Sequence, residues 1–295
     1  MKKFTAMVIS LTMVATISGC SAQNGEERTV TKENTTTTAV TTTATTTTPA
    51  VTTTAPAVTT EEATTTTTVA TTAEVETTTE APKKPELVVN KENGKVFLDF
   101  KKLPQSPEFN LGTSIASATA VLNYYGIEVT KSELFEYVPI SKHSDADGLW
   151  ENPKEFFLGD PTGYEMGYCS SDVLKNSIEA YLEANNISDI EVVDLSGSNF
   201  TDFYAEIEAG NPVIIWAEST MASLDVFQEI PLKNGEIFKY SPLYQCMTLV
   251  GYEDSGTIIE ADPMRESAEN NTYSESEAIS SYEMMGKQAL VIRRK

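Results

Sequence analysis

A long threonine-rich stretch confines folding to the second part of the chain. Between Thr35 and Thr79, 26 residues are Thr, and most of the others are Ala, Val, Pro and Glu. Without an aromatic residue, Leu or Ile, this stretch cannot bury enough apolar surface to offset the entropy of ordering. Thr with scattered Pro is typical of extracellular stalks that carry O-linked glycans. We therefore expect residues 20–86 to form a disordered linker, whose r.m.s. reach as a flexible coil is about 45 Å.

The N-terminus has the pattern of an export signal. Three residues, Met1-Lys2-Lys3, form a basic start, and the apolar run that follows ends at Gly19. This run is shorter than the ~20 residues needed to span a bilayer. Ile17-Ser18-Gly19-Cys20 resembles the lipobox of bacterial lipoproteins, which implies a signal peptide over residues 1–19 and a diacylglycerol on Cys20. We expect a lipid-anchored protein on the extracellular face of the bacterial cytoplasmic membrane; the alternative is an ordinary cleaved signal.

The remaining residues, 87–295, are enough for one domain with its own core. They hold 34 acidic and 15 basic residues, a net charge of −19. Nucleic acid and anionic lipid are therefore poor partners for this domain. Beyond Cys20 the chain holds only Cys169 and Cys246, and the sequence leaves open whether they pair. It gives no indication of the oligomeric state.

Apolar periodicity and capping residues predict an α+β fold. Gly126 ends the first helix, and Thr130 to Glu133 form a capping box that opens the second. The expected helices cover residues 114–125, 130–137, 171–185, 199–209 and 276–285, and the expected strands cover residues 213–216, 247–251, 257–260 and 289–292. Helices dominate early and strands late, so we expect two segregated layers rather than an alternating parallel sheet.

Seven short strings in one order carry a family resemblance. They are Leu122-Asn123-Tyr124-Tyr125-Gly126, Phe157-Leu158-Gly159-Asp160-Pro161, Gly167-Tyr168-Cys169, Pro212-Val213-Ile214-Ile215-Trp216, Leu249-Val250-Gly251-Tyr252, Asp262-Pro263 and Gly286-Lys287-Gln288-Ala289. Together they resemble the bacteriocin-processing-like cysteine peptidases, cysteine peptidase family 39 and its relatives. The resemblance covers nearly all of residues 98–292. It implies a papain-like fold, with an N-terminal helical half packed on an antiparallel sheet.

The resemblance also implies four functional positions. The family's nucleophilic Cys falls on Thr113, and its basic His falls on Gln245. The acid that orients the His falls on Asp262, and the Gln of the oxyanion hole falls on Gln105. A thiolate attacks and an imidazole takes up the proton in this chemistry. Thr has a much less acidic hydroxyl, and the Gln amide has no basic nitrogen.

Two supporting residues thus remain while both reacting groups are replaced. The sequence predicts an inactive peptidase domain that binds a peptide, a cell-wall component or a partner protein in a retained groove. Two alternatives stay open: an active hydrolase with displaced catalytic residues, and a structural spacer domain without a ligand. No cofactor is expected.

Other residues that could take part in catalysis or metal binding have simpler structural interpretations. Ser114 is expected to cap the first helix. Cys246 is expected to be a buried structural residue, because it neighbours the base position on a strand and points the other way. Cys169 should pack near the groove. His143 should lie in an exposed loop, and residues 145–148 should form a solvated acidic turn, so no metal site is expected.

Overall fold

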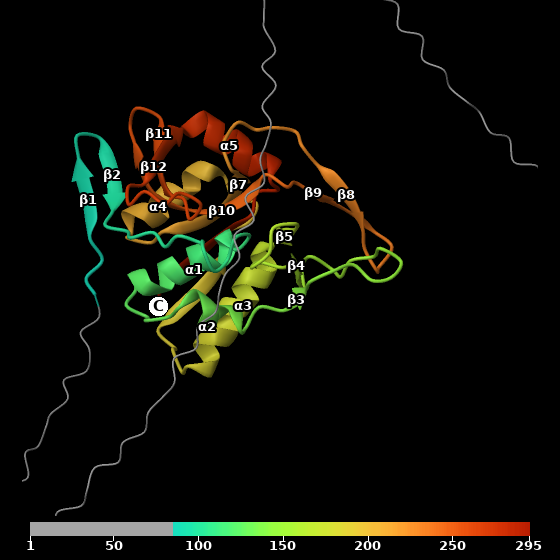
Figure 1. Ribbon diagram of the computed structural model, residues 1–295. Coiled ribbons are helices and arrows are strands. Elements are labelled where there is room, and N and C mark those ends of the chain that lie inside the picture. Colours follow the sequence, from blue (N-terminus) through green and yellow to red (C-terminus); the bar gives the residue numbers. More distant parts are fainter. Residues whose placement is uncertain (1–84) are drawn as a thin grey trace, which may run out of the picture. The chain divides into compact units, whose positions relative to one another are not determined.

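The computed structural model describes residues 85–295, in which five α-helices and thirteen strands form a mixed α+β domain (Figure 1). The predicted signal peptide, the lipidation site and almost all of the predicted linker lie outside these residues. The helices are α1 (Thr113–Tyr124), α2 (Lys131–Phe135), α3 (Ser171–Ala184), α4 (Phe203–Glu208) and α5 (Glu275–Met284). A 3-10 turn, η1 (Phe200–Asp202), leads into α4. The five expected helices are all present, and α2 is shorter than expected.

An eight-stranded sheet forms the centre of the domain. Its pairings are all antiparallel, and its order is β1-β2-β10-β7-β13-β6, with β11 paired to β10 and β12 paired to β11. The strands are β1 (Val89–Glu92), β2 (Lys95–Leu98), β6 (Ile190–Asp194), β7 (Val213–Glu218), β10 (Tyr244–Glu253), β11 (Thr257–Ala261), β12 (Asn271–Ser274) and β13 (Ala289–Arg294). This branched pairing curls the sheet at β10.

The long strand β10 holds the sheet together. It pairs with β7 through residues 244–249, with β2 through residues 251–253 and with β11 along its other edge. The register with β11 shifts between Leu249 and Gly251. A Cβ atom at Gly251 would lie 2.6 Å from the carbonyl oxygen of Val96, so only glycine fits where β2 joins. The bulge lets this one strand pair with three neighbouring strands.

Helices cover both faces of the central strands, which changes the expected layering. Helices α1, α2 and α3 lie together on one side of the sheet in Figure 1, and α4 and α5 lie on the other. All six residues of β7 are buried, as expected for a strand covered on both faces. Helix α1 is also enclosed, with residues 113–122 all buried. The prediction of two segregated layers was therefore wrong, because α4 and α5 return the chain to the far face.

Two small sheets extend from the main one. The strands β3 (Ile140–Ser141), β4 (Phe157–Gly159) and β5 (Gly167–Tyr168) form one, and the hairpin of β8 (Gln228–Pro231) and β9 (Ile237–Tyr240) forms the other. No helix within residues 85–295 is long and apolar enough to cross a membrane.

Candidate functional site

Thr113 is the first residue of helix α1 and is fixed against strand β10. Gly112 takes the N-cap position without a side-chain cap. The Thr113 side chain is nearly buried, at 6% exposure, and its hydroxyl accepts the backbone N–H of Cys246 at 3.1 Å. One turn later, the Ser117 hydroxyl donates to the carbonyl oxygen of Cys246 at 3.2 Å. Thr113 and Ser117 therefore join the helix to the sheet.

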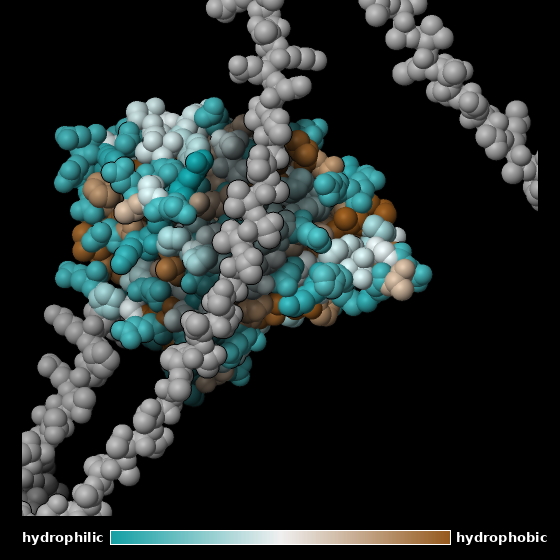
Figure 2. All heavy atoms as spheres, in the orientation of Figure 1, coloured by the Kyte–Doolittle hydropathy of each residue, from teal (hydrophilic) through white to brown (hydrophobic). Residues whose placement is uncertain are grey.

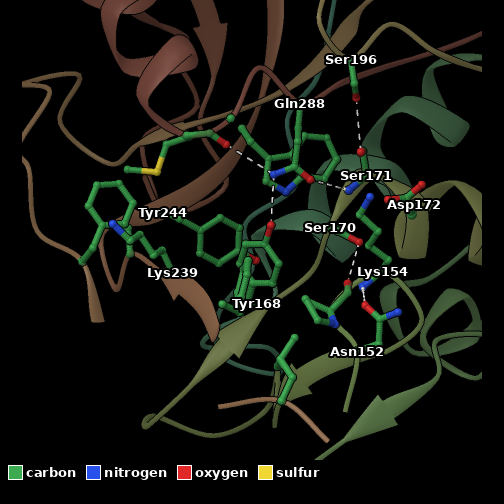
Figure 3. Close-up of a pocket in the computed structure, with 18 of the residues that line it drawn as sticks. Asn152, Lys154, Tyr168, Ser170, Ser171, Asp172, Ser196, Lys239, Tyr244 and Gln288 are labelled. Carbon is green, nitrogen blue, oxygen red and sulfur yellow. Dashed lines mark hydrogen bonds between the residues drawn. The ribbon is translucent and has the colours of Figure 1, made fainter. Parts of the chain in front are cut away.

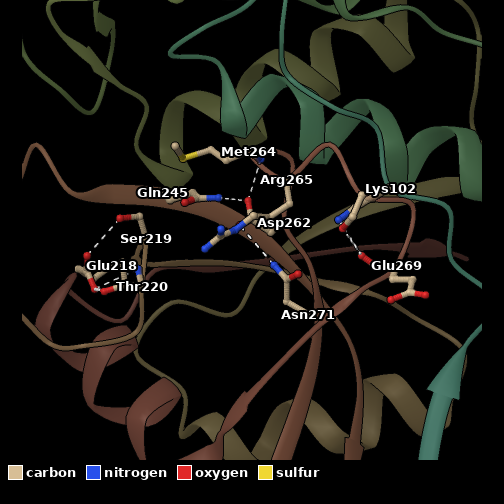
Figure 4. A network of polar contacts seen from close by, with 11 residues as sticks. Lys102, Glu218, Ser219, Thr220, Gln245, Asp262, Met264, Arg265, Glu269 and Asn271 are labelled. Carbon is tan, nitrogen blue, oxygen red and sulfur yellow. Dashed lines mark hydrogen bonds and ion pairs between the residues drawn. The ribbon is translucent and has the colours of Figure 1, made fainter.

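Gln245 and Asp262 form a buried side-chain pair (Figure 4). The Nε2 atom of Gln245 donates to Oδ1 of Asp262, and the Oε1 atom of Gln245 is buried without a partner in the described chain. Asp262 also accepts the backbone N–H of Met264 at 2.7 Å and bonds from Arg265 at 3.3 Å and Asn271 at 3.4 Å. Several donors thus converge on this carboxylate, which holds the amide of Gln245 as it could hold an imidazole.

Gln105 lies on the segment that borders Asp262. Its backbone N–H donates to the carbonyl oxygen of Pro263 at 2.9 Å, and its side-chain Nε2 donates to the carbonyl oxygen of Asn110 at 2.8 Å. Its Oε1 atom is buried without a partner within residues 85–295. The hydrogen bonds between Gln105 and Pro263, Gln245 and Asp262, and Thr113 and Cys246 bring the four predicted positions into one region of the fold.

A buried acid and base beside Asp262 were missed by sequence reasoning. Glu260 is fully buried, and neither of its carboxylate oxygens has a hydrogen-bond partner in the described residues. Burial, reinforced by the nearby charge of Asp262, raises the pKa of Glu260 well above its usual range, which favours the protonated carboxyl. Burial lowers the pKa of Lys102, whose Nζ donates to the carbonyl oxygen of Glu269 at 2.8 Å. The one signal for Glu260 was its position inside the apolar run of residues 257–261.

Both cysteines of the described region are buried free thiols. Burial raises the pKa of Cys169 to about 12 and the pKa of Cys246 well above its usual range. Neither thiol therefore ionises near neutral pH, as a nucleophile must. The expectation of a buried Cys246 is confirmed. Cys169 lies next to a cavity that Tyr244 and Trp216 line: its backbone N–H donates to the Tyr244 hydroxyl at 2.9 Å, and its carbonyl oxygen accepts the Trp216 indole N–H at 2.6 Å.

Ser114 does not have the role expected from the sequence. The N-cap is Gly112, and Ser114 lies inside the first turn of α1, fully buried. Its hydroxyl lies near the Cys169 thiol and has no hydrogen-bond partner within residues 85–295. The prediction of a helix cap was wrong because α1 begins at Thr113, one residue earlier than predicted.

The region around His143 has the predicted loop character. His143 is exposed, and Asp145 Oδ1 accepts the backbone N–H groups of Asp147 at 3.0 Å and Leu149 at 2.9 Å. These bonds close an acidic turn at the surface. Within residues 85–295, no group of three or more His, Cys, Asp and Glu side chains is arranged to hold a metal ion.

A cavity lies beside the four predicted positions without including them (Figure 3). It measures about 830 Å³ and lies among the start of α3, the end of β7, the β8–β9 hairpin and the turn before β13. Tyr244 lines it, while the next residue, Gln245, bonds to Asp262 away from it. Sequence reasoning did not predict this cavity, because residues far apart in the chain build it.

The fold, with a buried helix that starts against a central strand and an acid held beside that strand, agrees with a cysteine-peptidase-like domain, the class that comparison with known proteins supports. A model of the Peptidase_C39 like family matches residues 97–290, and the chain belongs to this family.

Two relatives agree with this assignment. The chain is 27% identical over 191 residues to the "Uncharacterized protein YvpB" of Bacillus subtilis (strain 168), across 64% of this chain and 72% of that protein. A crystal structure described as a C39-like peptidase from Bacillus anthracis superposes with a TM-score of 0.62 at 26% identity, covering 69% of this chain and 99% of that one. The predicted resemblance over residues 98–292 is therefore confirmed at the level of the C39-like family, whose model matches residues 97–290.

Proposed function

We propose that this chain is a surface-tethered, catalytically inactive member of its family, with a papain-like arrangement of helices and sheet. In this proposal the domain binds a peptide, a cell-wall component or a partner protein. The lipid anchor at Cys20 and the threonine-rich linker hold it at the extracellular face of the membrane.

The observation that carries the proposal is how Thr113 and Gln245 are used. At the position of the family's nucleophile, the Thr113 hydroxyl accepts a backbone N–H group. At the position of the base, the amide of Gln245 is bonded to Asp262 and has no nitrogen that can take up a proton. The only His of the chain, His143, lies in the exposed loop described above.

Displaced catalysis by cysteine receives no support from the geometry. Both thiols are buried, and both have raised pKa values. A spacer without a ligand would not need the cavity of about 830 Å³. Binding without cleavage is the function that agrees best with both features.

Restoring the two reacting groups tests the proposal. We expect Thr113→Cys alone and Gln245→His alone to give little peptide cleavage, because nucleophile and base act as a unit. The double variant should show the first measurable cleavage. Its introduced thiol should have a pKa about one unit or more below the usual ~8.5, because a neighbouring imidazole stabilises the thiolate. Thiol alkylation measured against pH gives this value.

A misplaced pair provides the control. Ser114→Cys combined with Gln245→His puts a thiol one residue along α1, on the side of Cys169, and should remain inactive. Peptide cleavage by the unaltered chain that survives Thr113→Ala would disprove the proposal of inactivity. A folded Thr113→Cys/Gln245→His variant with an ordinary thiol pKa would show that the two positions are misassigned.

The anchor is tested separately at Cys20. Cys20→Ala should release the protein from the membrane fraction or stall removal of the signal peptide, because the lipid has no other attachment point in this proposal. Cell fractionation and the mass of the mature protein measure both effects. Thr35→Ala is the matched control and should leave fractionation unchanged. Normal processing and normal membrane retention of Cys20→Ala would contradict the lipid anchor.

A further inference from the structure

One part of the cavity wall beside β10 is aromatic, and polar atoms of these residues take part in hydrogen bonds. Gln288 Nε2 donates to the Tyr168 hydroxyl at 3.1 Å, and Gln288 Oε1 accepts the backbone N–H of Ser171 at 2.9 Å. The indole N–H of Trp216 and the hydroxyl of Tyr244 are both bonded to the backbone of Cys169. The ring of Phe238 packs on Tyr168 with ring centroids 4.8 Å apart. This part of the wall therefore offers ring faces and apolar surface to a ligand, whereas charged side chains line other parts of the cavity.

An exposed apolar rim continues this surface. Phe227 is 37% exposed and Ile237 is 58% exposed, and both line the cavity. Leu224 and Val226, on the segment that leads into β8, are also exposed. Figure 2 shows hydrophobic atoms at the surface on the side of the domain where the β8–β9 hairpin lies. Concentration of large exposed apolar side chains in one place is typical of an interaction site.

The charged residues around the cavity favour a ligand of positive charge. Asp172, Asp194 and Glu236 line it and make no ion pair within residues 85–295. Lys154 and Lys239 line it too, also without an ion pair in the described residues, so carboxylates outnumber ammonium groups. The domain as a whole has the net charge of −19 noted above. A field of this sign attracts cations and repels anions at long range.

We propose that this cavity binds an extended cationic peptide, with an aromatic or large aliphatic side chain of that peptide inserted between the walls. This inference rests on the proposed function and names its ligand class. A volume of about 830 Å³ is suited to one large side chain and the adjoining backbone. The exposed carboxylates of the rim then face the basic residues of the peptide.

Calorimetric titration of the full chain with synthetic peptides tests the inference. The probe is acetyl-Gly-Lys-Phe-Lys-Gly-amide, and its counterparts carry Ala in place of Phe or Glu in place of both Lys. We expect the Phe peptide to bind roughly tenfold more tightly than the Ala peptide, because a buried Phe side chain contributes most of the apolar area. The Glu peptide should bind more weakly than the Lys peptide, and this difference should shrink as salt is added.

Surface variants locate the binding. Phe227→Ser/Ile237→Ser should lower the affinity for the Phe peptide about tenfold, since both rim contacts are lost. Val88→Ser/Tyr164→Ser is the matched control, because it removes exposed apolar side chains that do not line the cavity. This control should bind as the parent does. Equal affinity for Phe and Ala peptides, tighter binding of the Glu peptide, or binding unaffected by the rim variant would each overturn the inference.

Mass analysis of the recovered peptide separates this inference from the proposed function. Intact peptide with rim-dependent binding supports both. Cleaved peptide with rim-dependent binding supports the cavity and overturns the proposed lack of catalysis. Intact peptide whose binding is unchanged by the rim variant contradicts the proposed binding in the cavity. It leaves the proposal of an inactive domain unaffected.

Discussion

Two adjacent residues of β10 belong to regions of opposite character. Tyr244 lines a cavity of about 830 Å³, whereas Gln245 is fully buried and bonded to Asp262. Successive side chains of a strand point to opposite faces, so one backbone segment supplies both regions. The cavity keeps its aromatic surface available, whereas the region of Asp262 uses most of its polar groups internally.

This difference separates structural from binding roles. Asp262, Gln245 and Thr113 hold loops, strand and helix together through side-chain and backbone hydrogen bonds. Phe227 and Ile237 are exposed and support little besides the cavity rim. Changes near Asp262 should therefore alter stability, and changes at the rim should alter binding.

Asp262→Ala should have the largest effect on stability. It removes the acceptor for Gln245 Nε2, for the Met264 backbone N–H and for Asn271. Leaving buried partners of a charged group unpaired costs about 3–5 kcal/mol. Denaturant unfolding of the full chain measures this free energy. The exposed Asp254→Ala should cost little, and an Asp262→Ala chain as stable as the parent would show that the network is not structural.

Glu260→Gln should have a smaller effect that depends on pH. Because burial raises the pKa of Glu260 above its usual 4.5, the folded chain keeps a proton that the unfolded chain releases above that pH. The parent therefore loses stability as pH rises from 4.5 towards the folded pKa, and Glu260→Gln does not. The difference between the two proteins should change by about 1.4 kcal/mol per pH unit in this window.

Unfolding measured between pH 4 and pH 8 supplies the comparison. Asp262, Lys102 and Arg265 face Glu260 and are present in both proteins. Glu266 is exposed and has no ion pair in the described chain, so the stability of Glu266→Gln should depend on pH as the stability of the parent does. A pH-independent difference for Glu260→Gln would mean that Glu260 is ionised in the folded chain.

The elements that the sequence predicted well have strong local signals. Helix α3 was expected over residues 171–185 and is found at Ser171–Ala184, because its apolar residues repeat at helical spacing. The hairpin of β1 and β2 was missed although Asn93-Gly94 stands at its turn with positive φ values of 52° and 76°. Such a dipeptide is a known hairpin signal, and Asn234-Gly235 marks the β8–β9 hairpin in the same way.

The proximity of the candidate positions could be predicted from sequence, whereas the cavity could not. Thr113, Gln245 and Asp262 were chosen by their offsets from recognisable strings, and the structure brings them into one region. The cavity depends on how the β8–β9 hairpin lies across the ends of α3 and β7, and no local pattern encodes that packing. The fate of Ser114 depended on a one-residue shift in the start of α1, which is finer than periodicity can resolve.

In the proposed inactive domain, the hydrogen bond from Cys246 to Thr113 would oppose the introduction of a cysteine at position 113. A hydroxyl is a good acceptor for a backbone N–H, and a thiol is a weak one. Thr113→Cys would therefore weaken a buried bond, at a cost of about 1 kcal/mol, and under this proposal it would bring no activity without a base at position 245. A chain with the proposed function would thus lose stability before it gained any catalysis.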